Sequence, residues 1–330
     1  MTSEDAQEAT VSFPTHAGEF ALGTFAHVGG RPFPGLVVDG RVRDVSPLGR
    51  TVRDLLVDWD STLASLRRLA SDPRGDWRGG DTLLVLPPLE PGQILQSGAN
   101  YRQNVIDLVA AERASAQGVT PDEARTEAAA MMDVRAESGT PYLFLGSSRA
   151  MCGAFDDVVL PREGEQHDWE LELALVIGKP GRRIRRGEAM AHVAAYTIGN
   201  DITTRDRLYR PDLKAIGTDW FVAKNAMTFL PTGPFLVPAE FVGDPMQLRI
   251  RLEHNGVVRQ DESTKDMIFD VARLIEYAST ITELRPGDLL LTGSPAGNGA
   301  HWDVFLKPGD VLEGSITGLG AQRNTCVAED

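Results

Sequence analysis

The sequence predicts an α+β fold whose β architecture is mixed and mostly antiparallel. Beyond residue 141, short apolar segments punctuated by glycine and proline arrive roughly every dozen residues, which is typical of antiparallel strands joined by turns. Apolar residues at helical spacing mark a few other segments, and one of them, at 267–284, interrupts the strands. No internal repeat or low-complexity tract stands out.

We expect a small N-terminal α+β domain over 1–90. Residues 20–27 and 35–45 are predicted strands, and the second segment contains Asp39-Gly40, a dipeptide suited to a tight hairpin turn. Apolar residues at helical spacing predict one helix over 51–70. The stretch 71–80 is rich in glycine, aspartate and arginine and is predicted to be a loop.

The larger domain, 91–330, begins with a predicted helical hairpin over about 102–138. A short loop leads into a helix from about residue 102 to residue 117, which Gly118 closes. The sequence Thr120-Pro121-Asp122-Glu123 then supplies an N-cap, a proline at the first helical position and a capping-box glutamate for a second helix.

The remainder of this domain is predicted to be mostly strands. The predicted strands lie within 141–146, 156–161, 171–178, 194–199, 235–238, 248–258, 288–295 and 311–316.

Composition excludes several classes of protein. The chain of 330 residues is 42% hydrophobic and 24% charged, as in ordinary globular proteins. Its net charge of −14, without a basic stripe, disfavours nucleic acid and anionic membranes as partners. No apolar run is long enough to span a bilayer, the polar first residues lead us to expect no secretory leader, and Cys152 and Cys326 lack metal-site spacing. We expect a cytoplasmic protein with free thiols that binds a small molecule.

Two glutamates and an aspartate are candidate metal ligands. Glu170 and Glu172 are two residues apart, so on a strand they share a face with Asp168. Like charges at that spacing repel unless they are solvated, protonated or bridged by a cation. Asp201 follows another predicted strand, where its side chain can project into a cleft. The alternative is a solvated acidic face on an edge strand.

Basic and glycine-rich motifs follow these carboxylates. Arg205 lies four residues after Asp201, and Lys224 is a lone lysine within the apolar run WFVAKNAM. Such a lysine either serves a buried site or extends its ammonium group to water. The segment TGSPAGNG, which contains Ser294, is either a turn-rich loop or a place where backbone amides approach a carboxylate.

Taken in order, these motifs resemble the fumarylacetoacetate hydrolase family over about residues 95–325. The resemblance implies a β-roll domain, a homodimer, and a Mg²⁺, Mn²⁺ or Ca²⁺ ion held by carboxylates. It makes Glu170, Glu172 and Asp201 the metal ligands, and hard carboxylate oxygens suit such ions. It also makes Arg205, Lys224 and Ser294 substrate-binding residues, with serine in place of the more frequent threonine.

One departure from the family concerns the general base. The segment GANYRQN resembles the family's GxNYxxH, whose histidine works with a glutamate three residues later. Here these two positions are Asn104 and Asp107, and Tyr101 of the same motif is expected to contact substrate. Asparagine can hold a water molecule but cannot take its proton. Asn104 could also be only a polar residue of a helix N-terminus. His167 and His301 are either replacement bases or loop histidines.

The resemblance therefore implies a metal-dependent enzyme acting on a small oxo acid. We expect a hydrolase that cleaves a carbon–carbon bond of an acylpyruvate or 1,3-diketo acid, with Asn104, Asp107, Arg205 and Lys224 in catalysis. The alternatives are a 2-oxo acid decarboxylase, isomerase or hydratase, or a catalytically impaired relative, because the histidine is missing. The hairpin at 102–138 is expected to cover the site.

Overall fold

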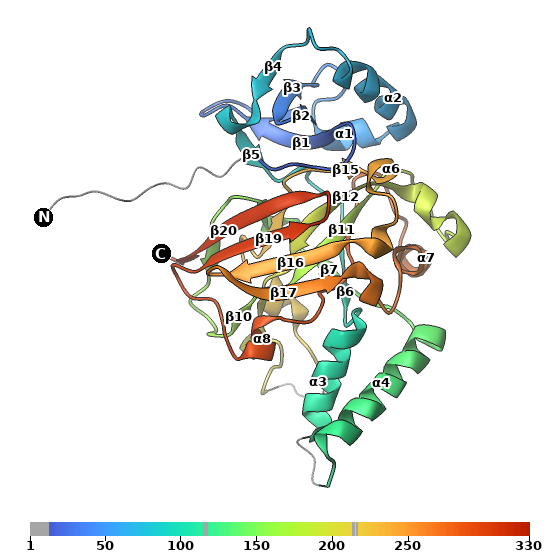
Figure 1. Cartoon of the computed structure of the whole chain (residues 1–330), viewed down its shortest axis with the longest axis vertical. Helices are drawn as coiled ribbons and strands as arrows, with labels where there is room; N and C mark the ends of the chain where they lie inside the picture. The colour runs from blue at the N-terminus through green and yellow to red at the C-terminus, as the bar shows by residue number, and fades with distance from the viewer. Residues whose placement is uncertain (1–12, 115–117, 213–214, 216) are drawn as a thin grey trace, which may run out of the picture.

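In the computed structural model, which describes residues 13–114, 118–212, 215 and 217–330, the N-terminal segment forms a five-stranded sheet with two helices (Figure 1). The strand order is β4-β3-β2-β1-β5. These elements are β1 (Ala21–Ala26), β2 (Phe33–Val38), β3 (Arg41–Asp44), α1 (Val52–Leu56), α2 (Trp59–Ala70), β4 (Trp77–Gly79) and β5 (Leu84–Leu86).

The N-terminal elements agree with prediction in part. The turn between β2 and β3 is at Asp39-Gly40, where both φ angles are positive, at 46° and 72°. The predicted helix over 51–70 is two helices, because the Asp58 side chain accepts a hydrogen bond from the Ser61 amide and caps a new helix. The loop predicted at 71–80 contains β4, which pairs with β3. A boundary at residue 90 stays a prediction.

The second sheet is the largest and carries the acidic motif. Its main path runs β7-β6-β18-β11-β12-β14-β8, with β15 paired to β12. Its strands are β6 (Ile94–Gly98), β7 (Tyr142–Gly146), β8 (Met151–Gly153), β11 (Leu171–Ile177), β12 (Val193–Asn200), β14 (Leu230–Thr232), β15 (Val237–Pro238) and β18 (Leu289–Leu291).

A third sheet, in the order β17-β16-β19-β20-β9, packs against the second. Its strands are β9 (Val158–Leu160), β16 (Arg249–His254), β17 (Val257–Ser263), β19 (Val311–Ile316) and β20 (Gly320–Ala328). The remaining described elements include the ladder of β10 (His167–Asp168) with β13 (Thr203–Thr204), and the helices α5 (Trp220–Lys224), α6 (Ala239–Val242), α7 (Val271–Ile281) and α8 (Gly299–Trp302). The mixed, mostly antiparallel α+β fold is as predicted.

Strand β11 separates two hydrophobic cores. Leu171, Leu173 and Leu175 point into the core shared with the third sheet. Ala174 and Val176 point the other way, into the core shared with the N-terminal helices. Because alternate side chains of a strand face opposite ways, Glu172 lies on the second face, at the end of β11 that the N-terminal core does not cover.

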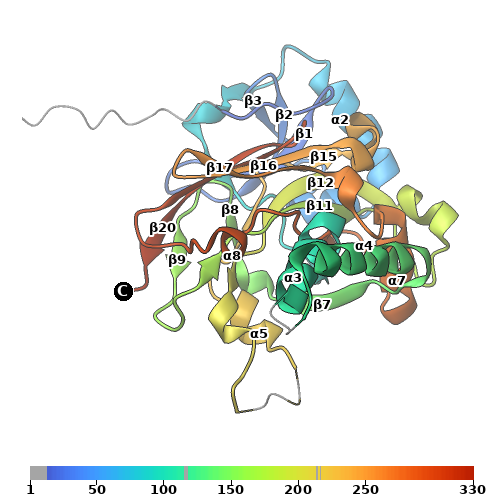
Figure 2. The ribbon, with the colours of Figure 1, turned by 60° about the horizontal axis from the view of Figure 1, so that its bottom comes forward.

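The predicted helical hairpin consists of α3 (Arg102–Ala114) and α4 (Pro121–Ser138). Thr120 and Glu123 form the predicted capping box. The predicted end of the first helix, at 115–117, lies outside the described residues. A small core joins the helices, made of Val105, Ile106, Ala128 and Met132. The hairpin projects from the end of the molecule opposite the N-terminal sheet in Figure 1, and it lies at the front in Figure 2, where that end is turned forward.

One further prediction differs from the structure, and two strands of the larger sheets had not been predicted. The helix predicted at 267–284 is shorter, because Asp270 caps α7 and the helix ends at Ile281. Strand β6 was not predicted, since its segment ILQSG alternates weakly and both strands that it pairs with, β7 and β18, are distant in the sequence. Strand β20 was also missed; it pairs with β19 over 320–325 and with β9 over 326–328.

Candidate metal and substrate site

Three carboxylates meet where β11 and β12 pair. Glu170 and Glu172 flank Leu171 at the start of β11, and Asp201 follows the end of β12. The antiparallel register places Glu172 opposite Gly199, and the Asp201 amide donates a hydrogen bond to the Glu170 carbonyl at 2.9 Å. One carboxylate oxygen from each residue lies within 4.8 Å of the others. The three side chains are therefore close enough to share one cation.

These carboxylates are not a solvated face. Glu172 is 1% exposed and Asp201 2% exposed, so that alternative interpretation of the acidic motif is wrong. The Glu172 carboxylate accepts a hydrogen bond from the Gly293 amide at 2.7 Å. Gly293 has a φ of 94°, which favours glycine, and this lets the TGSPAGNG loop approach so closely. The loop amide thus approaches one of the protein's own carboxylates.

Lys224 is buried within the carboxylate cluster. Its side chain is 2% exposed, so the alternative that it extends to water is wrong. The Lys224 Nζ donates to Asp201 Oδ2 at 2.5 Å, to Glu170 Oε2 at 2.8 Å and to Thr203 Oγ1 at 2.7 Å. The apolar run around it is the short helix α5, capped by Asp219, which presents Lys224 at its last residue.

Arg205 joins the cluster from the other side. Its Nε donates to Asp168 Oδ2 at 2.8 Å, and its Nη2 donates to Glu170 Oε1 at 2.5 Å. Asp168 is fully buried and also accepts hydrogen bonds from the Gly299 and Ala300 amides. Asp168 therefore holds Arg205 in place and ties the cluster to α8.

Charge in this cluster favours a cation. If all are ionised, Asp168, Glu170, Glu172 and Asp201 carry four negative charges against the two positive charges of Arg205 and Lys224. A divalent cation would balance the remaining two charges with oxygen donors of the kind that Mg²⁺ or Mn²⁺ prefers. The residues present therefore fit such an ion.

The pKa values of the carboxylates reflect the same imbalance. Burial, together with the charges of Asp201 and Glu170, raises the pKa of Glu172 well above its ordinary value. Burial raises the pKa of Asp201 to about 6. Burial would also raise the pKa of Glu170, but Lys224 and Arg205 outweigh it and hold that pKa below its ordinary value. Protons would thus compete with a cation at Glu172 and Asp201.

Two amide side chains orient the carboxylates and were not predicted. Gln96 on β6 donates from Nε2 to Asp201 Oδ1 at 2.7 Å, and Gln96 is 2% exposed. Asn298 donates from Nδ2 to Glu170 Oε1 at 3.2 Å. Asn298 lies in the TGSPAGNG motif, so its neighbourhood was recognised. An isolated glutamine within an apolar segment was the only available signal for Gln96.

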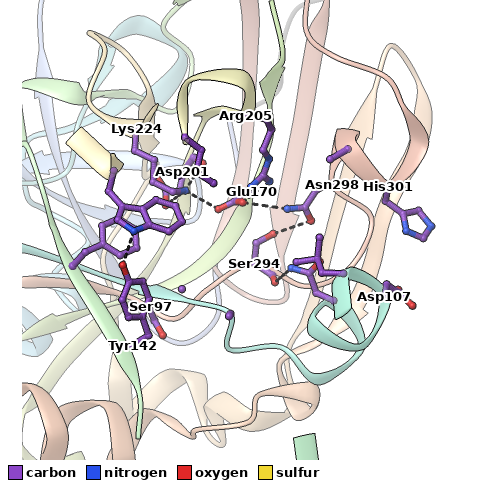
Figure 3. Close-up of a pocket in the computed structure, with 18 of the residues that line it drawn as sticks. Ser97, Asp107, Tyr142, Glu170, Asp201, Arg205, Lys224, Ser294, Asn298 and His301 are labelled. Carbon is purple, nitrogen blue, oxygen red and sulfur yellow. Dashed lines mark hydrogen bonds and ion pairs between the residues drawn. The ribbon is translucent and has the colours of Figure 1, made fainter. Parts of the chain in front are cut away.

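Glu170, Asp201, Arg205 and Lys224 of this cluster line a cavity of about 610 Å³, and Figure 3 shows residues of its lining. The cavity brings together most of the predicted site residues: Asn104, Asp107, Glu170, Asp201, Arg205, Lys224 and Ser294. Glu172 and Tyr101 are not among its lining residues, although Glu172 adjoins Glu170 and Asp201. Tyr101 is fully buried in the core and its backbone bridges to Met267, so the structure does not bring Tyr101 to the cavity, contrary to the expectation that it contacts substrate.

The hairpin contributes Asn104 and Asp107 to the cavity wall. The Asn104 Nδ2 donates to the Ser294 carbonyl at 3.1 Å, so its side chain contacts the TGSPAGNG loop and not its own helix. Asp107 Oδ1 accepts hydrogen bonds from Gln103 Nε2 at 2.8 Å and from Arg125 Nη1 at 2.7 Å. Asn104 and Asp107, which occupy the positions of the family's histidine and glutamate, therefore both face the same cavity.

Ser294 and the two candidate histidines occupy different surroundings. Ser294 is 6% exposed, and its Oγ accepts a hydrogen bond from Gln260 Nε2 at 3.0 Å. His167 is buried against Thr204 Oγ1 at 3.0 Å and does not line the cavity, and burial lowers its pKa. His301 is exposed and lies at the edge of the cavity. Of the two, only His301 is placed to reach a bound molecule.

The fold and the site together define a class of protein: an α+β protein in which buried carboxylates and basic side chains meet at a cavity. The family model described as Fumarylacetoacetate (FAA) hydrolase C-terminal matches residues 93–327. The chain therefore belongs to the fumarylacetoacetate hydrolase family. In the described residues, no helix is both long and apolar enough to cross a bilayer.

Relatives include enzymes of different reaction types. The chain is 34% identical over 300 residues to a 2,4-didehydro-3-deoxy-L-rhamnonate hydrolase of Sphingomonas sp., covering 89% of this chain and 92% of that protein. It is 33% identical over 283 residues to a mitochondrial oxaloacetate tautomerase of Bos taurus, covering 85% and 81%.

Solved structures agree with the fold. A probable 2-hydroxyhepta-2,4-diene-1,7-dioate isomerase from Mycobacterium abscessus superposes with a TM-score of 0.71 at 30% identity, covering 94% of this chain and 99% of that one. Maleylpyruvate hydrolase from Sphingobium sp. SYK-6, solved with manganese(II) and pyruvate, gives 0.72 at 24% identity, covering 94% and 100%. The family thus includes hydrolases, isomerases and tautomerases.

Proposed function

We propose that this protein is a divalent-metal-dependent hydrolase that cleaves a carbon–carbon bond of a 2,4-dioxo acid of the acylpyruvate type. The observation that supports this most is the convergence of Glu170, Glu172 and Asp201 beside Lys224 and Arg205, all of which except Glu172 line one cavity. The similarity to a 2,4-didehydro-3-deoxy-L-rhamnonate hydrolase over 89% of the chain supports the reaction type.

The proposed reaction consumes one water molecule. Water adds to the C4 carbonyl, the C3–C4 bond breaks, and C3 takes up a proton, so that acylpyruvate and water give a carboxylate, pyruvate and one proton. A divalent cation held by Glu170, Glu172 and Asp201 would polarise the 2-oxo acid and stabilise the negative charge that develops on it.

The protein's own residues have separate roles in this scheme. Arg205 and Lys224 provide fixed positive charge next to the developing enolate. Asn104 can hold the attacking water by a hydrogen bond but cannot accept its proton. Asp107 lines the same cavity and can accept that proton. Gln96 and Asn298 orient two of the carboxylates.

A second candidate is a tautomerase or isomerase of 2-oxo acids. The presence of asparagine at position 104 favours this second candidate, because moving a proton within the substrate does not require an activated water molecule. Several relatives are named as oxaloacetate tautomerases, including one that is 41% identical over 189 residues.

The two candidates are separated by their products. Purified protein would be incubated with Mn²⁺ or Mg²⁺ and acetylpyruvate, and pyruvate and acetate would be quantified. We expect stoichiometric formation of both, and its loss after EDTA treatment. Enol-to-keto conversion of oxaloacetate without any pyruvate from acetylpyruvate would instead establish the tautomerase.

A further inference from the structure

We propose that the acyl tail of the substrate is uncharged and apolar, a specificity that rests on the proposed function and makes a dicarboxylate a poor substrate. The basis is an aromatic wall on one side of the cavity, defined by Tyr142, Phe144 and Trp220. Tyr142 and Phe144 are two residues apart on β7 and therefore face the same way.

The aromatic wall is a preformed surface. The rings of Phe144 and Trp220 stack with centroids 4.8 Å apart at an interplanar angle of 14°. The Tyr142 and Trp220 rings are 6.1 Å apart, and the Trp220 indole N–H donates to the Tyr142 hydroxyl, as Figure 3 shows. Because the indole N–H is already bonded, the donor that the wall leaves to a ligand is the Tyr142 hydroxyl, and the rest of its surface consists of apolar ring faces.

The wall begins next to the carboxylate cluster. Lys224 Nζ lies 5.8 Å from the ring centroids of both Phe144 and Trp220, and the same nitrogen contacts Glu170 and Asp201. Trp220 is the first residue of α5 and Lys224 the last, so one helix positions both. A substrate whose 2-oxo acid lies at the carboxylate cluster would therefore extend its tail along the aromatic wall.

Charge excludes a second carboxylate in that tail. Among the described residues that line the cavity, the arginine and lysine side chains are those of Arg205 and Lys224, and both are bonded to carboxylates. Asp107 adds negative charge to the lining. In Figure 3, His301 is drawn on the opposite side of the lining residues from Tyr142. A tail carboxylate would lose water and would find no arginine or lysine among these residues that is free of a carboxylate partner, whereas an alkyl or aryl tail gains by burial.

The test compares two tails of the same shape. 4-Methylpentanoylpyruvate and succinylpyruvate differ mainly in replacing an isopropyl group by a carboxylate. We expect kcat/KM with Mn²⁺ to be at least about tenfold higher for the methylpentanoyl compound, since its isopropyl group gains by burial whereas the carboxylate is penalised when it is buried without a cationic partner. Equal values, or a preference for succinylpyruvate, would overturn the proposal.

Variants assign the preference to the cavity wall. Trp220→Leu should reduce the preference, while Phe221→Leu, at the neighbouring position that is 75% exposed and outside the cavity lining, should keep it. Ala111→Arg adds a cation on the cavity side of α3 and should improve succinylpyruvate by about tenfold. Ala114→Arg adds the same charge to α3 outside the cavity lining and should not improve hydrolysis of succinylpyruvate.

Failure of the proposed function is distinguishable from failure of this inference. If neither compound is hydrolysed, the hydrolase assignment fails, and metal-dependent binding of the two compounds is measured by calorimetry. Tighter binding of the methylpentanoyl compound would still support an apolar tail. Equal binding, or no binding of either, would overturn it.

Discussion

Glu172 and Asn104 show how much depends on single residues at this site. Glu172 is almost completely buried and faces two other carboxylates, and the hydrogen bond that it accepts comes from the Gly293 amide. A buried carboxylate without a cationic partner of its own is costly unless it is protonated or bound to a metal ion. Asn104 occupies a position facing the cavity where a titratable side chain is expected.

The first prediction concerns metal affinity. Glu172→Gln removes one carboxylate ligand while keeping side-chain size and burial, so Mn²⁺ affinity should fall at least about tenfold. Isothermal titration calorimetry measures this change. Glu163→Gln, which removes a charge from an exposed residue of the same region, is the matched control and should bind Mn²⁺ like the original protein. Equal Mn²⁺ affinity in both variants would remove Glu172 from the metal site.

The second prediction concerns the missing base. Asn104→His should raise hydrolysis of acetylpyruvate at least about tenfold, since a general base contributes about 10²- to 10⁴-fold. Asp107 lies three residues along the same face of α3, where it can orient an imidazole. The pH–rate profile should show a new ionisation near about 6.5.

Asn104→Gln is the control, since it changes side-chain length without adding a titratable group. Metal affinity should stay constant in both variants. Hydrolysis would be the wrong chemistry if Asn104→His hydrolysed acetylpyruvate no faster than the original protein and the original protein isomerised 2-oxo acids.

At the scale of elements, the hairpin α3–α4 is held by few apolar contacts. Its own core consists of Val105, Ile106, Ala128 and Met132, and its outer contacts include ion pairs of Arg102 with Asp133 and Arg125 with Asp107. Such exposed ion pairs contribute little to stability, about 0 to 1 kcal/mol each. The packing of the hairpin thus depends on a small set of side chains.

The third prediction tests the hairpin as a cover. Ala128 is fully buried between the helices, so Ala128→Asp places an uncompensated charge there and should separate them. If the hairpin covers the site, kcat/KM should fall by at least about tenfold, because the catalytic groups lose positioning and water exclusion. Mn²⁺ affinity should be retained, because none of Glu170, Glu172 and Asp201 is on the hairpin.

Ala130→Asp adds the same charge on the exposed side of α4 and serves as the control. Hydrogen exchange across 102–114 reports whether the helices have separated. Separated helices with unchanged kcat/KM would mean that the hairpin does not cover the site.

A second element-level feature joins the β16–β17 hairpin to the turn before β19. Asp310 accepts hydrogen bonds from Asn255 Nδ2 at 2.8 Å and from the Lys307 amide at 2.8 Å, and its Oδ2 lies 3.0 Å from His254 Nε2. Burial would raise the pKa of Asp310, but the hydrogen bonds of Asn255 and His254 outweigh it and hold that pKa below its ordinary value.

The fourth prediction follows from the sign of that shift. A carboxyl group with a lowered folded-state pKa stabilises the protein fully above its unfolded pKa of about 3.9, and this contribution is lost as the pH falls through the folded value. Asp310→Ala should lower the free energy of unfolding at pH 7 by about 1.5 to 3 kcal/mol. The difference from the original protein should shrink below about pH 4.

Urea unfolding at several pH values measures this difference. Asp157→Ala removes a charge from an exposed aspartate and should show a much smaller effect at pH 7. A difference that did not change between pH 7 and pH 3 would contradict the assigned role of the Asp310 carboxylate.

At the scale of the whole molecule, the site joins distant parts of the chain. Gln96, Glu172, Asp201, Lys224 and Asn298 come from segments spread over more than half of the sequence, and the site therefore exists only in the folded state. A cation that binds there binds the folded protein and not the unfolded chain. Metal binding should therefore stabilise the entire fold.

The fifth prediction is a metal-dependent melting temperature. At a Mn²⁺ concentration of 100 times Kd, linkage adds about 2.7 kcal/mol, which should raise Tm by at least about 3 °C. Differential scanning calorimetry with Mn²⁺ and with EDTA measures the change. Glu172→Gln, which weakens the site, should lose most of this shift, and a shift that persisted in that variant would place the stabilising ion elsewhere.

The sequence by itself determined the features that depend on local chemistry and spacing. The Asp39-Gly40 turn, the Thr120 capping box and the alternation of β11 involve neighbouring residues, and all were predicted. The order of motifs also identified the family before the fold was known. Local interactions of this kind are set by side-chain type and by the periodicity of helices and strands.

Only the tertiary structure decided which groups are buried and which are paired. The sequence left open whether Glu172 and Lys224 face water, and the fold buries both. It placed Tyr101 in the site, whereas packing puts it in the core, and it did not indicate that Gln96 would bond to Asp201 across 105 residues of chain. Burial and long-range pairing depend on how separate strands come together, and no local pattern encodes that.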